Sequence, residues 1–528
     1  MIQKLLIANR GEIAIRIMRT AVNMGVKTVA VYPADDQKSL HVYRADEAVE
    51  LTGRGAAAYL DAEQLIQVAL DTGCNAIHPG YGFLSEVAGF ANACEAANLT
   101  YVGPDGETLA LFGDKSEARR FAIDHQVPVI AGTQTATTLD MASEFLASLD
   151  GQSMIIKAVA GGGGRGVRVV DSIDELEQAF NQSGREAMAA FGDDALYVEA
   201  YLPKVRHIEI QVLGDGSGNV VCLGERDCSL QRRHQKIIEI APAPDLQNNI
   251  RSELIAAAEK LAKATHYRGA GTFEFLVDAD QKAWAFIEAN ARLQVEHTIT
   301  EEIYDIDLVE IQLRIAGGES LEKIDLGKPR QHGYAIQLRI NMETMEADGS
   351  VRPSGGTITA FNPPSGPGIR LDTYAYAGYD TNPGFDSMLA KLIVHHRSAH
   401  KRGAQQITND FNAALKNVYR SLCEFQLEGV ATNISFLQSL LQSEDVAAVD
   451  YHTRYIDENI KQLTETGVHH AHYASKQAEN TALRAGAVLE SNDPLAVLAF
   501  GQQEQHNQTD AATMDDSWLK SPMQGTII

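Results

Sequence analysis

The sequence lacks the features of a membrane, secreted or disulfide-rich protein. No apolar run reaches the ~18 residues that a membrane-spanning helix needs, and no signal or transit pattern precedes the strand-like KLLIA of residues 4–8. Only five cysteines occur in 528 residues, and they are scattered without a CxxC pair. Their number and spacing argue against a disulfide framework and against a structural zinc site. We therefore expect a cytoplasmic protein in a reducing compartment.

Basic charge is also scarce. The chain has 45 Lys and Arg residues against 70 Asp and Glu residues, and its net charge is −25. A nucleic-acid surface needs clustered, uncompensated positive charge, so we predict no nucleic-acid partner, and we expect no membrane partner either. One local basic cluster is the exception, and it contains Arg226, Arg232, Arg233, His234 and Lys236.

The chain does contain the alternation of strand and helix patterns that is typical of a multidomain α/β protein. At about 150 residues per domain, 528 residues suggest three or four domains. In residues 1–112, apolar runs such as KTVAVY alternate with amphipathic helical patterns, which predicts a doubly wound parallel sheet. Residues 113–330 surround a glycine run, residues 331–445 are strand-rich, and residues 446–520 form a polar connector with one or two helices. We classify the fold as α/β, or α+β overall.

Four consecutive glycines interrupt the segment IIKAVAGGGGRGVRVV, residues 155–170. A flexible linker is the simplest explanation, but linkers are usually longer and polar, whereas this run lies between two strand-like segments. We expect a hairpin whose tip takes positive φ and presents peptide N–H groups to phosphate oxygens. Lys157 precedes the tip and can add a positive charge. A phosphate-binding lid is therefore preferred over a linker.

A second stretch, AFIEANARLQVEH at residues 285–297, carries polar residues at every second position. In an extended strand this spacing places five side chains on one face: Glu288, Asn290, Arg292, Gln294 and Glu296. A solvent-exposed strand face would tolerate them but would not require them. Glu274, in GTFEFLV, adds a carboxylate from a similar strand. Two carboxylates and an amide form a hard oxygen site for Mg²⁺, while Arg292 can bind a planar anion and Glu296 can act as a base.

Eight motifs in collinear order resemble the biotin carboxylase component of biotin-dependent carboxylases. They are LLIANRGEIAIRI, HPGYGFLSE, GDK, KAVAGGGGRGVRVV, ERDCSLQRRHQKIIEIAPAP, GTFEFL, EANARLQVEH and GYAIQLRI. The resemblance covers roughly residues 1–441, and its specificity comes from the combination of motifs rather than from any one of them.

This resemblance implies an ATP-grasp enzyme that uses ATP, Mg²⁺ or Mn²⁺, and bicarbonate to carboxylate N1 of biotin through carboxyphosphate. It implies an N-terminal biotin carboxylase domain at 1–112, an ATP-grasp domain at 113–330 with a lid at about 131–203, and a C-terminal biotin carboxylase domain at 331–445. The nucleotide contacts that it implies are Lys115, Lys157, Gly161, Gly162, Gly163, Gly164, Gly166, Glu199, Leu202, His207, Gln231, His234 and Leu276.

The resemblance also implies the remaining roles. Glu274 and Glu288 match metal ligands, with Asn290 beside them. Glu296 matches the base that deprotonates bicarbonate, and Arg339 matches the residue that stabilises the biotin enolate. The bicarbonate pocket corresponds to Lys236, Arg292, Gln294 and Val295.

Several neighbouring residues are interpreted as structural. His78, Tyr81 and Phe83 in HPGYGFLSE are expected in turns or in the core, and Glu86 is expected only to orient its neighbours. Cys228 is expected to pack, because nothing in the sequence activates its thiol.

The chain departs from the common family pattern at a few positions, none of which removes a charged group with a proposed chemical role. The departures are Val87, Ile240, Ala289, Ala291, Thr298, Gln337 and Leu338. They resemble carboxylases that carry several activities on one long chain, such as pyruvate carboxylase and single-chain acyl-CoA carboxylases. We expect an acyl-CoA acceptor such as acetyl-CoA or propionyl-CoA, with pyruvate or urea as the alternative.

The last residues, SPMQGTII at 521–528, resemble the first strand of a biotinyl domain, but no AMKM-like hairpin occurs in the chain. We therefore expect a truncated chain that carries no biotin and acts on a biotinyl domain and with a carboxyltransferase domain, as a homodimer or larger assembly. A non-catalytic ATP-binding assembly module is the alternative, although such a module would not need Lys236, Arg292, Glu296 and Arg339 together. An ATP-grasp ligase of the carbamoyl-phosphate or purine type would not be expected to contain RLQVEH.

Overall fold

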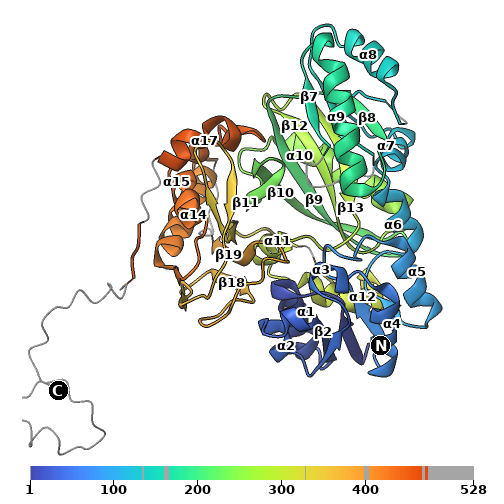
Figure 1. Ribbon diagram of the computed structural model, residues 1–528, viewed down its shortest axis with the longest axis vertical. Coiled ribbons are helices and arrows are strands. Elements are labelled where there is room, and N and C mark those ends of the chain that lie inside the picture. The colour runs from blue at the N-terminus through green and yellow to red at the C-terminus, as the bar shows by residue number, and fades with distance from the viewer. Residues whose placement is uncertain are drawn as a thin grey trace, which may run out of the picture. The chain divides into compact units, whose positions relative to one another are not determined.

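The computed structural model describes residues 2–133, 136–159, 166–327, 329–397, 404–465 and 470–473 (Figure 1). The chain begins with a parallel sheet in the order β3-β2-β1-β4-β5. Its strands are β1 (Lys4–Ile7), β2 (Lys27–Pro33), β3 (Glu47–Leu51), β4 (Ala76–His78) and β5 (Thr100–Tyr101). The helices of this part are α1 (Gly11–Asn23), α2 (Leu40–Arg44), α3 (Gly55–Ala58), α4 (Ala62–Asp71), α5 (Ala88–Ala96) and α6 (Gly106–Gly113), with a short 3-10 turn η1 (Ala34–Asp36). The predicted parallel sheet is confirmed.

Burial on both faces explains the continuous apolar run of β1. Leu5 and Ile7 pack with Ile13 and Ile17 of α1, whereas Leu6 belongs to a separate hydrophobic core on the other face. Alternate residues of a strand point to opposite faces, so a strand covered on both sides must be apolar throughout.

The glycine run belongs to a small three-stranded sheet in the order β7-β6-β8. Its strands are β6 (Met154–Ala158), β7 (Arg168–Val170) and β8 (Leu196–Ala200), and its helices are α8 (Leu139–Ser148) and α9 (Ile173–Phe191). β6 and β7 pair antiparallel from Met154–Val170 to Ile156–Arg168, which confirms the predicted hairpin. Residues 160–165 lie outside the described residues, so the predicted contacts of Gly161, Gly162, Gly163 and Gly164 are not described. This unit projects from the body of the molecule in Figure 1.

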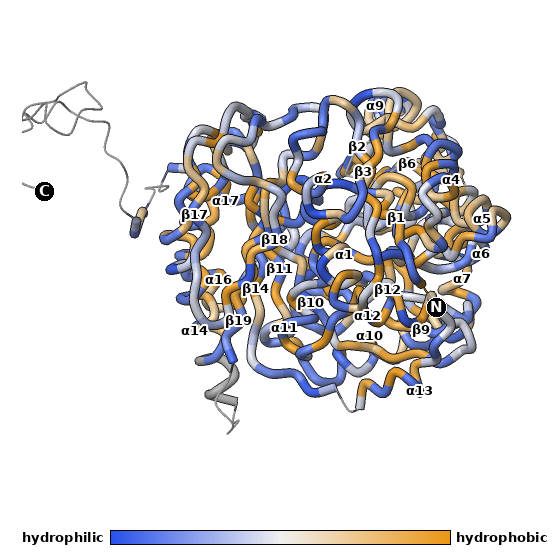
Figure 2. The backbone as a smooth tube through the Cα atoms, turned by 90° about the horizontal axis from the view of Figure 1, so that it is seen from below, coloured by the Kyte–Doolittle hydropathy of each residue, from blue (hydrophilic) through white to orange (hydrophobic). Residues whose placement is uncertain are grey.

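An eight-stranded sheet forms the largest layer, in the order β13-β12-β9-β10-β11-β14-β19-β18, and its neighbouring strands pair antiparallel. Its strands are β9 (Val205–Asp215), β10 (Val220–Arg232), β11 (Gln235–Ala241), β12 (Arg268–Asp278), β13 (Trp284–Asn290), β14 (Tyr334–Asn341), β18 (Ile369–Thr373) and β19 (Met388–His396). The sheet continues across residue 330, because β11 pairs with β14. Figure 2 shows hydrophobic residues along much of these strands and hydrophilic residues in many connecting loops.

The remaining helices lie beside this sheet or pack on the helices that contact it. They are α7 (Lys115–Asp124), α10 (Asn248–Ala264), α11 (His297–Tyr304), α12 (Leu308–Ala316), α13 (Leu321–Ile324), α14 (Ala404–Glu424), α15 (Ile434–Leu441), α16 (Glu444–Ala448) and α17 (Tyr455–Glu465). Short strands complete the fold: β15 (Glu343–Met345) pairs with β16 (Val351–Pro353), and β17 (Ala360–Asn362) pairs with β20 (Gln426–Glu428). No described helix is long and apolar enough to cross a membrane.

The first part of the expected connector packs into the C-terminal core. Tyr451, Tyr455, Ile456 and Leu463 are buried with strands β14 and β19. Residues 446–465 are therefore part of this folded unit, whereas residues 474–520 lie outside the described residues. The domain limits drawn from the sequence stay predictions.

Candidate active site

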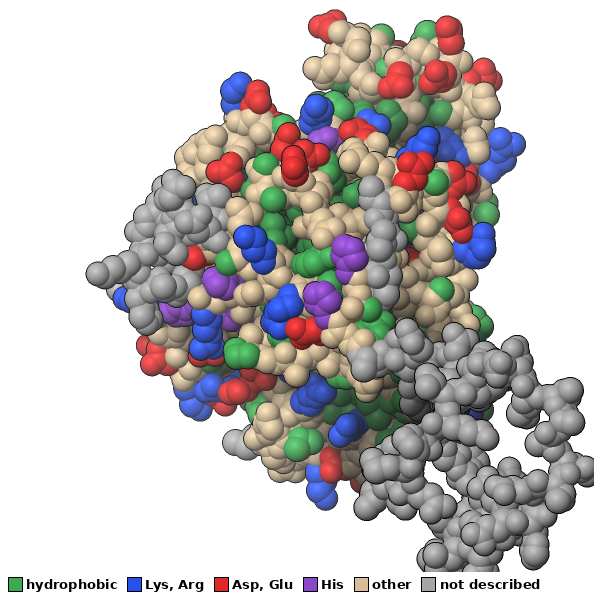
Figure 3. Space-filling view, turned by 90° about the vertical axis from the view of Figure 1, so that its left-hand side faces the viewer, with side chains coloured by type: hydrophobic (Ala, Val, Ile, Leu, Met, Phe, Trp, Pro, Cys, Tyr) green, Lys and Arg blue, Asp and Glu red, His purple; other side chains and the backbone are tan. Residues whose placement is uncertain are grey.

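A cavity of about 850 Å³ lies where the parallel sheet, the lid and the large sheet meet. Sixteen of the predicted site residues line it: Lys115, Lys157, Leu202, His207, Gln231, His234, Lys236, Glu274, Leu276, Glu288, Asn290, Arg292, Gln294, Val295, Glu296 and Arg339. Glu199 and Gly166 do not line it, although Glu199 holds a lysine that does. In Figure 3, histidine and basic side chains lie near the middle of the face shown, below the projecting lid, with acidic side chains among them.

The predicted strand through residue 296 is wrong beyond Asn290. β13 ends at Asn290, and Arg292, Gln294 and Glu296 follow in an irregular segment before α11. Period-two spacing is compatible with any extended segment, but here the carbonyls of Gln294 and Glu296 accept hydrogen bonds from His297 and Ile299 and start the helix. The side chains nevertheless reach the same cavity.

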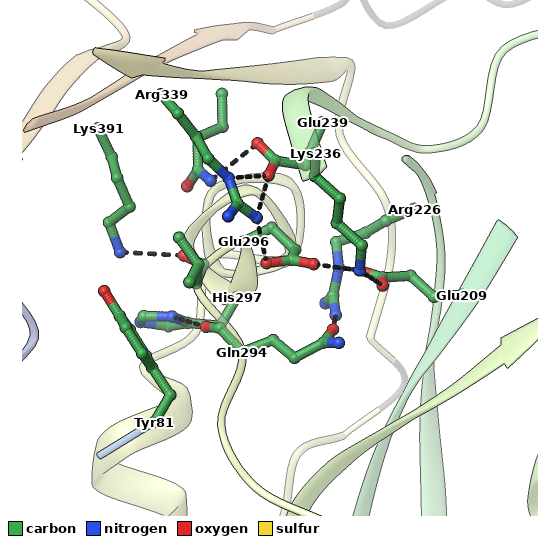
Figure 4. Close-up of polar contacts among 12 residues, drawn as sticks. Tyr81, Glu209, Arg226, Lys236, Glu239, Gln294, Glu296, His297, Arg339 and Lys391 are labelled. Carbon is green, nitrogen blue, oxygen red and sulfur yellow. Dashed lines mark hydrogen bonds and ion pairs between the residues drawn. The ribbon is translucent and has the colours of Figure 1, made fainter. Parts of the chain in front are cut away.

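Glu296 lies at the centre of the polar side chains (Figure 4). Its carboxylate accepts a hydrogen bond of 2.6 Å from Lys236 Nζ and one of 3.1 Å from Arg339 Nη2. Lys236 also donates to Glu209 at 2.6 Å and to Glu274 at 3.0 Å. One ammonium therefore joins three buried carboxylates, and Arg226 and Arg339 supply further positive charge to two of them, Glu209 and Glu296.

These contacts set the protonation states. Burial acts to raise the pKa of Glu296, but Lys236, Arg339 and Arg226 outweigh it and hold that pKa below its ordinary value. Burial acts in the opposite sense on Lys236, and the acidic groups around it, Cys228 and three glutamates, raise its pKa well above the usual range. Glu296 is therefore an ionised carboxylate at the wall of the cavity.

Arg226 and Glu209 were not predicted as site residues. Arg226 is fully buried and donates through Nε to Glu209, and through Nη2 to Gln294 at 2.9 Å. Gln294 Nε2 in turn donates to Glu274 at 2.6 Å. The signal that could have found Glu209 is a charged residue between Ile208 and Ile210 in an otherwise apolar strand.

Arg339 is held between two carboxylates. Its Nε donates to Glu239 at 2.6 Å, and its Nη2 reaches Glu296. Glu239 is fully buried on β11 and was not predicted from the sequence. Opposing attractions from Glu239 and Glu296 place the guanidinium at the cavity wall.

Two lysines line the part of the cavity next to the lid. Lys115 Nζ is 3.4 Å from Glu288, and Lys157 Nζ is 2.5 Å from Glu199. Lys115 begins α7 after Asp114, whose carboxylate caps that helix by accepting from the amides of residues 116 and 117. Both ammonium groups are thus held by carboxylates at the wall of the cavity.

The predicted metal ligands come from neighbouring strands. Glu274 and Glu288 are register partners on β12 and β13, and both line the cavity. Asn290 Nδ2 donates to Glu274 at 2.8 Å, while its Oδ1 accepts from Arg292 at 3.0 Å. Two carboxylates facing one cavity fit a divalent cation, whereas the oxygen of Asn290 is already occupied by Arg292.

A separate acidic group, His207, Glu209 and Glu274, brings its ligand atoms within 4.8 Å of one another. Lys236 already lies between two of its members. His207 is 2.6 Å from Glu274; burial acts to lower the pKa of this histidine, but Glu274 raises it. Lys236 therefore already supplies a positive charge to this group.

Arg292 and Lys391 hold the segment that carries Glu296 in place. Arg292 Nε lies 3.0 Å from Glu86, which agrees with the expected orienting role of Glu86. Lys391 Nζ donates to the Val295 carbonyl at 3.0 Å and is 3.0 Å from Glu12 of α1. Lys391 is fully buried and was not predicted.

The residues expected to be structural are placed as follows. His78 is fully buried, and its Nδ1 accepts from the Gly80 amide. Tyr81 donates to Glu12, and both Tyr81 and Phe83 line the cavity. Cys228 is fully buried, and burial raises the pKa of its thiol well above the ordinary value.

Comparison with known families follows the same order along the chain. Residues 1–109 match the biotin carboxylase N-terminal domain, residues 114–324 match the ATP-binding domain of the carbamoyl-phosphate synthase L chain, and residues 337–458 match the biotin carboxylase C-terminal domain. Biotin carboxylase 1 of Bacillus subtilis is 42% identical over 460 residues, which is 87% of this chain and 98% of that protein. The chain belongs to the biotin carboxylase family.

The chain also resembles larger enzymes. Mitochondrial pyruvate carboxylase of Mus musculus is 47% identical over 465 residues, covering 87% of this chain. The chain spans 38% of that relative's length. The family and the enzymatic class predicted from the sequence, a ligase that carboxylates biotin, are confirmed.

A solved structure gives the same fold. The biotin carboxylase domain dimer of Hydrogenobacter thermophilus 2-oxoglutarate carboxylase, in complex with MgADP, ADP and bicarbonate, has a TM-score of 0.81 and 38% identity. The match covers 90% of the present chain and 100% of the chain in that structure. The predicted fold class is confirmed, and the ligands of that structure agree with the predicted use of ATP, Mg²⁺ and bicarbonate.

Proposed function

We propose that this chain uses ATP to transfer a carboxyl group from bicarbonate to N1 of biotin, and that the reaction takes place in the cavity described above. The observation that carries the proposal is the position of Glu296, held between Lys236 and Arg339 at 2.6 and 3.1 Å. A site that only bound a nucleotide would need neither a buried, ionised carboxylate nor a guanidinium beside it.

In the first step, Glu296 accepts the proton of bicarbonate while a bicarbonate oxygen attacks the γ-phosphorus of ATP. The new P–O bond gives carboxyphosphate, and the bond to ADP breaks. Arg292 and Lys236 bind the anion, with Gln294 and Val295 completing the pocket. Because Lys236 already compensates Glu296, the ammonium can bind bicarbonate without losing contact with the base.

Lys115 and Lys157 are proposed to hold the phosphates of ATP. The nucleotide contacts proposed beside them are Gly166, Glu199, Leu202, His207, Gln231, His234 and Leu276. Glu274 and Glu288, with Asn290 beside them, would hold Mg²⁺, which when bound would offset the charge of the nucleotide phosphates. The lid would exclude water from carboxyphosphate.

In the second step, carboxyphosphate breaks down to CO₂ and phosphate. The phosphate takes the proton from biotin N1, and the nitrogen forms the new bond to CO₂. Charge develops on the ureido oxygen during this step, and Arg339 is the donor that stabilises it.

The experiment that tests this function measures ATP hydrolysis by the 528-residue chain with and without bicarbonate and free biotin. Hydrolysis should require bicarbonate and should rise when biotin is added. Glu296→Ala should abolish both effects. If added biotin gives no stimulation, and Glu296→Ala changes nothing, the chain is a non-catalytic ATP-binding module instead.

For the acceptor, we infer pyruvate rather than an acyl-CoA. The sequence favoured acetyl-CoA or propionyl-CoA, but curated relatives at 46–47% identity are pyruvate carboxylases from mouse, human and rat. Endogenous protein isolated with an antibody to this chain should fix labelled bicarbonate into pyruvate. Label in an acyl-CoA or in urea would overturn this inference.

The expected partners are proposals of the same kind. A biotinyl domain and a carboxyltransferase domain would supply and consume biotin, and a homodimer would agree with the dimer of the 2-oxoglutarate carboxylase domain. The expected cytoplasmic location stays a prediction, since the mouse relative is mitochondrial.

A further inference from the structure

Gln337 and Glu239 are paired across strands β14 and β11. Both side chains are fully buried, and Gln337 Nε2 donates to Glu239 Oε2 at 3.0 Å. Residues two apart on a strand share a face, so Gln337 and Arg339 lie on the same side of β14. One carboxylate therefore contacts both of them.

Glu239 uses its two oxygens differently. Oε2 accepts from Gln337, while Oε1 accepts from Arg339 Nε at 2.6 Å. A carboxylate with a donor fixed on one oxygen has a fixed plane, and this plane sets the direction in which the guanidinium is held. Arg339 is thereby kept from turning wholly toward Glu296, its second partner.

Thr298 completes the connection. It lies in the first turn of α11, two residues after Glu296, and its hydroxyl donates to Gln337 Oε1 at 2.5 Å. Because an ionised carboxylate can only accept, the amide nitrogen of Gln337 must face Glu239, and its oxygen must face Thr298. This rule sets the direction of both hydrogen bonds, from Thr298 to Gln337 and from Gln337 to Glu239.

We propose that Thr298, Gln337 and Glu239 form a positioning relay that sets the direction of the Arg339 guanidinium for the biotin half of the reaction. The inference rests on the proposed function, in which Arg339 acts on biotin and Glu296 acts on bicarbonate. The structure joins Thr298 and Gln337 in one hydrogen bond.

The relay also bears on the protonation of Glu239. Burial and the nearby Glu296 raise the pKa of this carboxyl above its ordinary value, while Arg339 and the Gln337 amide oppose the rise. Without the amide, one buried oxygen would lack its donor, and the carboxylate would be free to rotate or to take a proton. Either change would release the guanidinium.

The test compares two rates in one preparation of the 528-residue chain: bicarbonate-dependent ATP hydrolysis without biotin, and its stimulation by free biotin. Gln337→Leu should lower the biotin-stimulated rate about tenfold or more, since it removes a hydrogen bond to a charged group. The rate without biotin should be unchanged, because the contact between Lys236 and Glu296 does not involve Gln337.

Two milder variants keep the test decisive if Gln337→Leu folds poorly. Thr298→Val removes only the hydroxyl and should lower the biotin-stimulated rate without changing the rate in the absence of biotin. Thr298→Ser keeps the hydroxyl and should have the biotin-stimulated rate of the unchanged chain. Gln312→Leu is the matched control, because Gln312 is a buried glutamine on α12 outside the cavity. It should leave both rates unchanged.

The relay is disproved if Gln337→Leu and Thr298→Val lower both rates equally, or if they lower neither. An equal loss means a purely structural role for these residues. Failure of the proposed function is distinct, because then the unchanged chain would show no bicarbonate-dependent hydrolysis and no response to biotin.

Discussion

Lys236 Nζ lies 2.6 Å from Oε1 of Glu296, and Glu296 is buried while Lys236 is partly buried. This contact joins β11 to the segment before α11, two parts of the chain separated by about sixty residues. It keeps a carboxylate ionised inside the protein, at the wall of a cavity that is open to small anions. The chemistry of the site follows from this pair.

The first prediction concerns Glu296→Gln. The amide cannot accept the bicarbonate proton, so ATP hydrolysis should fall by about 10²–10⁴-fold, while nucleotide affinity should be retained. Steady-state hydrolysis and fluorescent-nucleotide titration would measure the two quantities. Glu310→Gln, on α12 away from the cavity, is the control and should behave as wild type. An active Glu296→Gln enzyme would show that another group is the base.

The second prediction concerns acid stability. The pKa values of Glu296 and Glu274 are lower in the folded chain than in the unfolded one, after the cations outweigh burial. As the pH falls through about 4.3, the unfolded chain binds more protons than the folded chain at these two glutamates. Their contribution to the free energy of unfolding is therefore present above that pH and is lost below it. Lys236→Met should lower the free energy of unfolding at neutral pH by about 3–5 kcal/mol and by less in acid.

Thermal unfolding at pH 7 and in acid would measure that difference. Lys282→Met is the control, because Lys282 pairs with Asp280 at the surface. It should have the same small effect at both pH values. A destabilisation by Lys236→Met that did not change with pH would contradict the stated protonation of the glutamates.

The third prediction concerns the metal. Chelation with EDTA should stop ATP hydrolysis, and Glu288→Gln should raise the Mg²⁺ concentration for half-maximal activity by at least about tenfold. Asn290→Ala should have a smaller effect, because its oxygen contacts Arg292. Activity titrated against Mg²⁺ would measure both. An unchanged Mg²⁺ requirement in Glu288→Gln would remove this residue from the metal site.

The fourth prediction concerns the contact between the parallel sheet and the large sheet. Lys391→Met leaves Glu12 as a buried, uncompensated carboxylate and should destabilise the protein by about 3–5 kcal/mol. Combining it with Glu12→Gln should recover part of the loss. A double-mutant cycle in thermal unfolding would measure the coupling, and strict additivity would mean that the two side chains do not interact.

Local patterns predicted much of this structure. The apolar runs of β1 and β2 predicted a parallel sheet, and the two strands around the glycines predicted the hairpin of β6 and β7. The alternation through Glu296 identified cavity residues correctly but predicted too long a strand, because side-chain spacing does not show where backbone carbonyls start a helix.

The partners of the site residues were the part that could not be predicted. Glu239, Glu209 and Arg226 lie on strands β11, β9 and β10, and their contacts depend on register across the sheet. Register is a tertiary property, and a shift by one residue reverses every side chain. Lys391 is a similar case, since nothing local to MLAKLIVHH shows that Glu12 of α1 lies beside it.

The central claim, that bicarbonate attacks the γ-phosphorus of ATP with Glu296 as the base, is tested most directly with oxygen-18. In this mechanism one bicarbonate oxygen becomes bonded to phosphorus and stays there when carboxyphosphate breaks down. Incubating the chain with labelled bicarbonate, ATP and free biotin should therefore give phosphate with one labelled oxygen, and Glu296→Gln should give almost none. Unlabelled phosphate released at the full rate would show that water attacks ATP, and it would contradict the proposed function.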